Sequence, residues 1–257
     1  MSNQSQISRL ETAKQDLRIA IQAKGVTVPA ADLIDTYAGY VDQISAKDNS
    51  MIDAFVSGTD NTLSSDTVTS IAAYRFYAFG ASAPVGYKLE HVDFPNVETI
   101  NQYAFDGCSI LEAVFPKCTA LVGNNVFRGA AITRASFPAM VNAPGNYAFR
   151  ACTSLTDVDF PQLETGGQYM FQQCNALLEA DFSNLRSIGY QMFLGATNFA
   201  KLTLRRTDQV CYTTSAAFNQ TPFASGGGAL YVPTSMVDAY KASPNWSWMV
   251  DRIFAIP

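Results

Sequence analysis

The chain is poor in charge, in histidine and in long apolar stretches. Only 15% of its 257 residues are charged and the formal net charge is −5, against roughly 25% charged residues in typical soluble domains. No run of Lys and Arg occurs, so nucleic acid is not an expected partner. No apolar run approaches the ~18 residues that cross a bilayer, so we expect no membrane insertion. With 48% hydrophobic residues, the chain can still bury a substantial core.

The residue types that carry catalysis or bind metals are also sparse. The single histidine is His91, and no Cys-x-x-Cys pair is present, so no metal site is predicted. Neither a Gly-x-Ser-x-Gly turn nor a His-Glu-x-x-His pair occurs. Gly226, Gly227 and Gly228 lack the Lys-Ser/Thr of a phosphate loop. We therefore expect no enzymatic activity and no cofactor.

The first residues of the sequence do not resemble a secretory leader. Residues 1–6 offer neither a basic start nor an apolar core, so we expect no export by that route.

The five cysteines are an odd number and include three at one recurring position. Cys108, Cys152 and Cys174 occupy a place that holds Ala130 and Ala196 in other copies. Small size is thus what the position requires, which predicts buried free thiols. A disulfide between Cys152 and Cys174 is not excluded by distance, but the alanines indicate that none is required.

A period of 22 residues dominates the middle of the chain. Phe105 recurs at this spacing as Phe127, Phe149, Phe171 and Phe193. Each copy also carries a Leu-x-x-Leu-x-Leu type segment, whose starts are Leu89, Ile110, Ile132, Leu155, Leu177 and Phe199. This period falls in the range of about 20–29 residues that leucine-rich repeats show. The pattern predicts a solenoid of short parallel strands over 49–225, with Tyr103 and Phe105 both facing the interior.

The two ends of the chain differ from the repeats. Apolar residues at three- and four-residue intervals predict helices over 7–23 and 30–44, a helical hairpin within 1–48. So small a hairpin buries little apolar surface and should pack on the solenoid, on another neighbour or on further copies of itself. Residues 51–56 should form a first strand, and an insertion at 80–84 stretches the first repeat. Residues 226–257 should form a strand-helix cap that covers the open end of the stack.

The repeat units resemble a known family. Leu-x-x-Val-x-Phe-Pro followed by Ile-x-x-Tyr-Ala-Phe-x-Gly-Cys is similar to the BspA-like, or treponemal-type, leucine-rich repeat over about 71–204. Residues 14–44 resemble the amino-terminal helical segment of phage tail and minor structural proteins. Residues 230–247 resemble the closing cap of such repeat proteins. Together the resemblances imply an α+β repeat fold with a leucine-rich-repeat solenoid.

The candidate ligand residues are the third and fifth positions of each segment, which should point to the exposed face of the sheet. They include Asp157, Asp159, Glu179 and Asp181, with Arg134 and Lys201 beside them. At ~4.8 Å between strands, the four carboxylates would form one acidic patch. The patch is interpreted as a solvated face, a ligand-contact face or a metal site, although no calcium-loop spacing is present. Two carboxylates would suffice for a glycosidase, but a flat sheet offers no deep pocket.

The resemblances lead to a functional expectation with two alternatives. The main one is a phage tail-associated receptor-binding protein in the virion, as part of a tail fibre or baseplate. Its helical segment would attach it to other tail proteins, as a homo-oligomer, most simply a trimer, and its repeats would recognise a bacterial surface protein or glycan. The alternatives are a BspA-like adhesin on the bacterial cell surface and a purely structural virion protein.

Overall fold

The computed structural model describes residues 62–73, 75–76, 89–143 and 145–257. The predicted helical hairpin within 1–48, the strand at 51–56 and the insertion at 80–84 lie outside the described residues. None of the described helices is long and apolar enough to span a bilayer.

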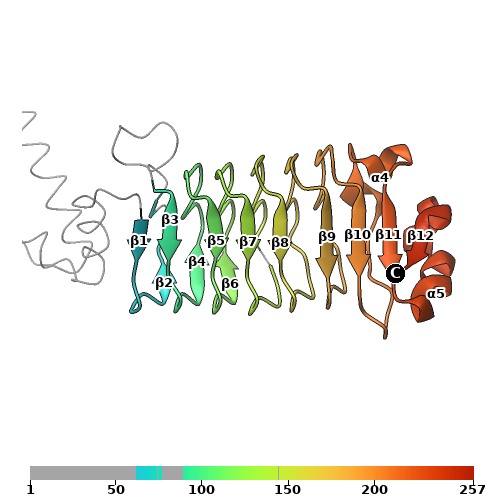
Figure 1. Cartoon of the computed structure of the whole chain (residues 1–257), viewed down its shortest axis with the longest axis horizontal. Helices are drawn as coiled ribbons and strands as arrows, with labels where there is room; N and C mark the ends of the chain where they lie inside the picture. The colour runs from blue at the N-terminus through green and yellow to red at the C-terminus, as the bar shows by residue number, and fades with distance from the viewer. Residues whose placement is uncertain (1–61, 74, 77–88, 144) are drawn as a thin grey trace, which may run out of the picture. The chain divides into compact units, whose positions relative to one another are not determined.

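The described chain is a stack of coils, each of which places one short strand on the same wall (Figure 1). These strands are β1 (Thr62–Ser64), β3 (His91–Asp93), β5 (Glu112–Val114), β7 (Arg134–Ser136), β8 (Asp157–Asp159), β9 (Glu179–Phe182) and β10 (Lys201–Leu204). The ladders that join these strands in the described residues are parallel, as the repeat pattern predicts. We call the outward side of this wall, continued by the two last strands of the chain, the sheet face.

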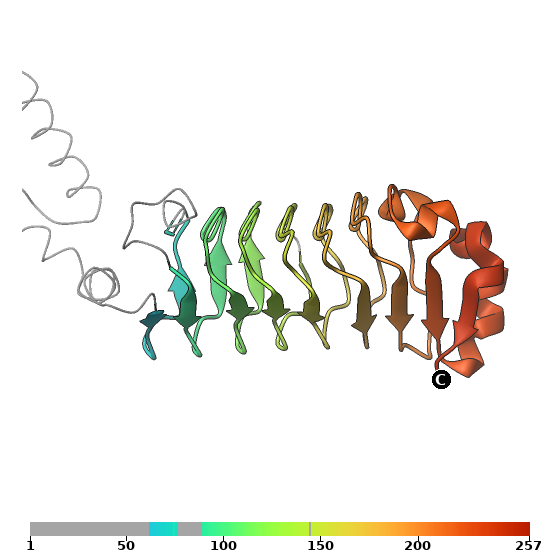
Figure 2. The same cartoon turned by 45° about the horizontal axis from the view of Figure 1, so that its top comes forward.

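A second wall runs along the opposite side of the stack (Figure 2). It consists of β2 (Ser70–Ile71), β4 (Thr99–Asn101) and β6 (Ala120–Val122), which pair in parallel. Farther along, single parallel bridges continue it, joining Asn142 to Thr165, Thr165 to Ser187 and Ser187 to Tyr212. The two walls enclose the core of the stack.

Phenylalanine columns fill the space between the walls. Phe105, Phe127 and Phe149 are fully buried and stack face to face, with ring centroids 5.0 and 5.2 Å apart. The phenylalanines that follow the sheet-face strands form a second column, in which Phe137 lies 5.3 Å from Phe160. The columns also touch each other edge to face, as between Phe137 and Phe149 at 5.7 Å. The inward position of the periodic phenylalanine is thus confirmed.

The tyrosine of the same motif does not face inward, which corrects the prediction for Tyr103. Its backbone has a left-handed φ of 55°, and the equivalent Tyr147 and Tyr169 have 61° and 56°. All three side chains are only half-buried. The left-handed turn directs the tyrosine to the outer rim while the phenylalanine two residues later enters the core. Tyr147 and Tyr169 stack on each other there, at 4.5 Å between centroids.

Glycines at a 22-residue spacing set how closely successive coils approach. A Cβ added to Gly145 would lie 2.1 Å from the carbonyl oxygen of Gly123. At Gly167 the corresponding distance, to the oxygen of Gly145, is 2.5 Å, and at Gly189 it is 2.4 Å to the oxygen of Gly167. Because real Cβ atoms do not approach a carbonyl oxygen so closely, this column accepts only glycine at the observed spacing.

The carboxyl-terminal end closes the stack with a cap of two strands and short helices, as predicted. Its strands β11 (Ala229–Val232) and β12 (Ile253–Ala255) extend the first wall beyond β10. Its helices are η2 (Ser215–Phe218), α4 (Pro222–Ser225), η3 (Thr234–Met236), α5 (Val237–Ala242) and η4 (Pro244–Arg252). Tyr240 and Trp246 are fully buried in the cap. Both bond to one residue of the stack: the N–H of Cys211 donates to the Tyr240 hydroxyl at 3.0 Å, and the Trp246 indole donates to the Cys211 carbonyl at 2.9 Å.

Candidate functional site

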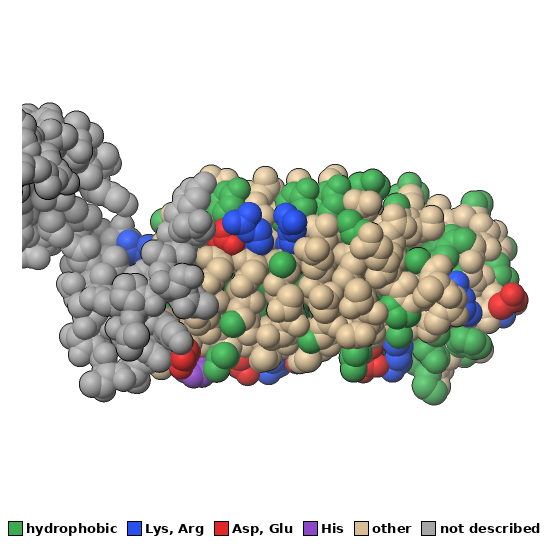
Figure 3. All heavy atoms as spheres, turned by 90° about the horizontal axis from the view of Figure 1, so that it is seen from above, with side chains coloured by type: hydrophobic (Ala, Val, Ile, Leu, Met, Phe, Trp, Pro, Cys, Tyr) green, Lys and Arg blue, Asp and Glu red, His purple; other side chains and the backbone are tan. Residues whose placement is uncertain are grey.

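The alternation of the short strands places two side chains of each strand on the sheet face. In β5 the middle residue Ala113 is fully buried, while Glu112 is exposed and Val114 half-buried. The same alternation leaves Arg134, Asp157, Glu179, Asp181 and Lys201 exposed on neighbouring strands. Figure 3 shows the resulting red and blue side chains together along one margin of the stack.

Three of the four carboxylates of the predicted acidic patch are paired with cations of adjacent coils. Arg134 Nε lies 3.1 Å from Asp157 Oδ2 on the next strand. Lys201 Nζ lies 2.8 Å from Glu179 Oε2, and this hydrogen bond raises the pKa of Lys201. The third cation, at Asp181, was not anticipated from the sequence because it lies just after β10 and outside the strand pattern.

That cation is Arg205, whose Nε donates to Asp181 Oδ1 at 2.8 Å. The hydrogen bond raises the pKa of Arg205. Three carboxylates therefore each hold a cation, and these cations of adjacent coils offset the repulsion between the like charges. Exposed pairs of this kind contribute little to stability, so they shape the surface more than they stabilise the fold.

Two further positions of the face lie deeper than predicted. Ser136 and Thr203 are buried, at 5% and 6% exposure, because each is a small side chain between larger neighbours on the adjoining strands. The Ser136 hydroxyl donates to Asp159 Oδ2 at 2.8 Å, which holds Asp159 half-buried. The Thr203 hydroxyl, in contrast, has no hydrogen-bond partner within the described part of the chain.

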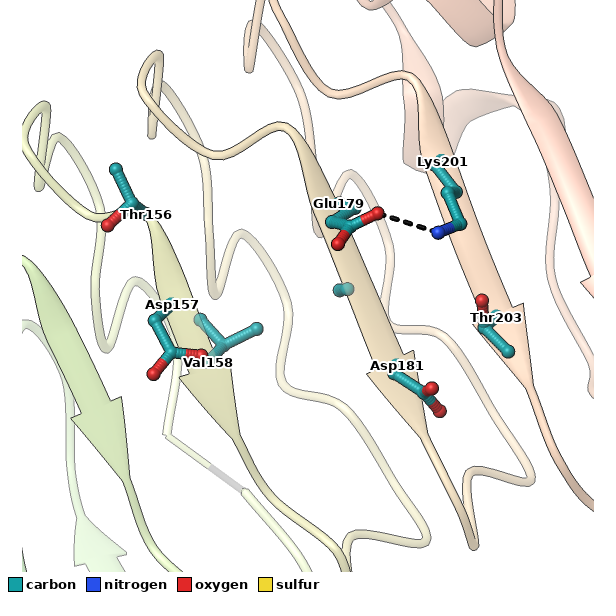
Figure 4. Close-up of a pocket in the computed structure, with 8 residues that line it drawn as sticks. Thr156, Asp157, Val158, Glu179, Asp181, Lys201 and Thr203 are labelled. Atoms are coloured by element: carbon teal, nitrogen blue, oxygen red, sulfur yellow. Dashed lines mark hydrogen bonds and ion pairs between the residues drawn. The ribbon is translucent and has the colours of Figure 1, made fainter.

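The wall is interrupted between β8 and β9. In the described residues β5, β7 and β8 form one sheet and β9 to β12 another, and no ladder pairs β8 with β9. A groove of about 170 Å³ opens at this interruption. Its lining residues are Thr156, Asp157, Val158, Glu179, Ala180, Asp181, Lys201 and Thr203 (Figure 4). Four of the six predicted site residues thus line the groove, and they come from three strands. The other two, Asp159 and Arg134, lie outside its lining.

An aromatic pair continues the face on the carboxyl-terminal side of the groove. Tyr231 on β11 is in register with Thr203 on β10 and with Phe254 on β12. The two rings lie 5.7 Å apart, and Lys201 Nζ lies 5.7 Å from the centre of the Tyr231 ring. Phe254 is 45% exposed and Tyr231 is half-buried. The alternation of β11 turns Tyr231 outward, whereas Leu230 and Val232 on either side of it are buried.

Neither a metal centre nor a reactive thiol accompanies the groove. In the described ranges no group of three His, Cys, Asp or Glu side chains is arranged to hold a metal ion. His91, on β3, lies several strands away from the groove residues. All five cysteines are buried free thiols, as was predicted for Cys108, Cys152 and Cys174.

The comparisons with known proteins concern the repeats. A family model described as the BspA type leucine rich repeat region matches residues 77–200 in six copies. No curated protein matches the sequence. Among solved structures, a leucine-rich repeat protein from Bacteroides ovatus ATCC 8483 is 17% identical, with a TM-score of 0.42. That similarity covers 66% of this chain and 48% of the other.

A leucine rich cell surface protein from Faecalibacterium prausnitzii A2-165 is 16% identical, with a TM-score of 0.30, over 62% of this chain and 57% of the other. The chain therefore covers only about half the length of these two structures. The match to the family model agrees with the motif, the period and the parallel strands described above. Residues 77–200 of this chain thus match the BspA type leucine rich repeat region in sequence.

Proposed function

We propose that this protein is a non-enzymatic binding protein of the bacterial cell surface, of the BspA-like adhesin type, and that its sheet face recognises the ligand. The observation that carries the proposal is the row of exposed, ion-paired side chains that successive coils hold in fixed register. Each coil contributes the same two outward positions, so the stack presents an extended surface whose chemistry varies while its geometry is constant. Repeat proteins commonly bind through extended surfaces of this kind.

The geometry of the face supports binding better than catalysis. Its groove, at about 170 Å³, is smaller than the pockets of roughly 300–1,000 Å³ that usually enclose small-molecule substrates. The carboxylates lining it are engaged by Lys201 and Arg205. A general acid or base would have to give up such a partner before it could transfer a proton.

The phage tail interpretation remains a prediction. The resemblance behind it lies in residues 14–44, outside both the described residues and the matched stretch 77–200. Trimer formation through the amino-terminal segment would favour it, and light scattering of the full chain measures this directly. The adhesin-type proposal needs only the repeat region and its face, and it is therefore the one we adopt.

Localisation and binding test the proposal together. An antibody against the repeat region should label intact producing bacteria, and label confined to purified phage particles would overturn the cell-surface assignment in favour of the tail. Labelled protein should also adhere to a target surface, and changing Asp157, Asp159, Glu179 and Asp181 together to Ser should weaken this adhesion. Unchanged adhesion would move the contact away from the sheet face, to the loops or the cap.

A further inference from the structure

The groove between β8 and β9 lies at one of two breaks in the parallel ladder of the sheet face, the other being between β3 and β5 in the described residues. Val158 beside the groove is 9% exposed, whereas Ala113 and Ala135 are fully buried; Val92, next to the other break, is half-buried. On β10, Thr203 is 94% buried, yet its hydroxyl has no hydrogen-bond partner within the described residues. Thr203 lines the groove and its hydroxyl oxygen is not enclosed, so a ligand in the groove can bond to it.

The charges around the groove balance. Three carboxylates, those of Asp157, Glu179 and Asp181, face three cations, those of Arg134, Lys201 and Arg205. A ligand therefore needs no net charge to enter. A carboxylate held by one cation keeps free lone pairs, because its two oxygens offer about four acceptor sites. The groove thus combines several hydrogen-bond acceptors with the donors of Lys201 and Thr203. A ligand with many hydroxyls can bond to both kinds of group, because each hydroxyl donates and accepts.

The aromatic pair next to the groove adds an apolar surface. Tyr231 adjoins Thr203 in register and is contacted by Lys201, and Phe254 extends the surface on β12. Sugar rings have polar hydroxyls at their rim and apolar C–H groups on their faces. A terminal sugar ring can present its hydroxyls to the groove while the next sugar of the chain lies against Tyr231. The ring of this tyrosine is apolar and its hydroxyl is polar.

We propose that the groove between β8 and β9 binds the end of an uncharged carbohydrate chain, with Thr203, Glu179 and Lys201 as hydrogen-bonding residues and Tyr231 as the adjoining apolar surface. The inference rests on the proposed function, since it names the ligand class of that binding face. The volume of about 170 Å³ suits one sugar ring. A protein partner would require an apolar interface centre, and within the strands of this face Phe254 is the single large apolar side chain with high exposure in the described residues.

The direct test is a titration of the full-length chain with neutral saccharides. The probes are methyl glycosides and short oligosaccharides of hexoses, N-acetylhexosamines and deoxyhexoses, observed through backbone amide chemical shifts. At least one probe should shift amides of β8, β9 and β10. The Thr203→Val variant should bind that probe about two- to tenfold more weakly, the effect of one lost neutral hydrogen bond. The Glu179→Gln variant should weaken binding of the same probe at least as much.

The control is Thr133→Val, which makes the same change at an exposed threonine that does not line the groove and whose hydroxyl bonds to the Leu111 carbonyl of the preceding coil. Its affinity for the probe should equal that of the unchanged protein. Because valine has nearly the shape of threonine, both variants are expected to fold, and their melting curves verify this. The inference is overturned if no probe shifts the groove amides, or if Thr203→Val and Thr133→Val bind alike.

Adhesion to cells separates the failure of this inference from that of the proposed function. Periodate treatment of the target surface, which cleaves vicinal diols of sugars, should abolish adhesion, and protease treatment should not. Adhesion that resists periodate and is lost on proteolysis would identify a protein ligand, overturning the carbohydrate assignment but leaving the binding function intact. Absence of adhesion to any surface, with label inside the cell, would overturn both.

Discussion

The thiol of Cys152 donates a hydrogen bond to the carbonyl oxygen of Phe127 on the preceding coil, at 3.0 Å. Cys174 does the same to Phe149 at 3.1 Å, and Cys108 to Phe76 at 2.8 Å. These cysteines are therefore more than small apolar side chains, because each also supplies a donor to a carbonyl inside the stack. The alanines at the equivalent position satisfy the size requirement without this bond.

We predict that the protein loses stability as the pH rises above about 9. Burial raises the pKa of Cys108 and Cys174 from 9.0 to about 12. Between these values the unfolded chain releases the thiol protons and the folded chain retains them, so the free energy of unfolding falls. Each such thiol contributes a loss of about 1.4 kcal/mol per pH unit. Urea unfolding at about pH 8 and about pH 10 measures the decrease.

The control for the alkaline loss is the triple variant Cys108→Ala, Cys152→Ala, Cys174→Ala. Alanine occupies the same position in two other coils, so the variant should fold and should lose less stability over the same pH interval. An equal loss in both proteins would show that thiol ionisation is not its cause.

We predict that Phe149→Ala destabilises the protein by about 3–5 kcal/mol, the usual cost of removing a buried phenylalanine. Phe149 is fully buried between Phe127 and Phe171, at 5.2 and 5.6 Å. Tyr147→Ala, two residues earlier on the rim, should cost much less because Tyr147 is only half-buried. Denaturant melts of both variants test this contrast, and a loss below about 1 kcal/mol for Phe149→Ala would contradict the inward column.

The contrast between Phe149 and Tyr147 shows what a repeat pattern can predict. A fixed spacing identifies equivalent positions, so the stacked phenylalanines, the small thiol position and the parallel strands followed from the sequence. It does not reveal backbone φ, and the left-handed turn that sends Tyr147 outward was missed. Nor does it identify partners outside the pattern, so Arg205 and the pairing of Asp181 emerged only from the structure.

We predict that Gly167→Ala is strongly destabilising whereas Gly129→Ala is mild. The Cβ of residue 167 would lie 2.5 Å from a backbone oxygen, which cannot rotate away, so coils must separate, at a cost of about 1–3 kcal/mol or more. At Gly129, with φ of +66°, a Cβ meets nothing within 4 Å. Only the left-handed backbone opposes alanine there, for about 1 kcal/mol.

The equivalent position to Gly129 in the next coil already holds Ala151, at φ of 58°. Thermal melts of the two variants compare the costs directly. Equal losses of stability in the variants at positions 129 and 167 would mean that backbone conformation, and not the approach of neighbouring coils, is what requires glycine at both positions.

We predict that Tyr240→Phe weakens the attachment of the cap. The Tyr240 hydroxyl accepts the N–H of Cys211, and Phe would leave that buried donor without its partner, at a cost of about 1–3 kcal/mol. Tyr231→Phe removes the same hydroxyl from a half-buried ring on the sheet face and should change stability little. Because the cap covers the open end of the stack, the loss should appear first as faster amide exchange in β10 and β11. Exchange that accelerates uniformly along the stack would instead show that cap and coils unfold as one unit.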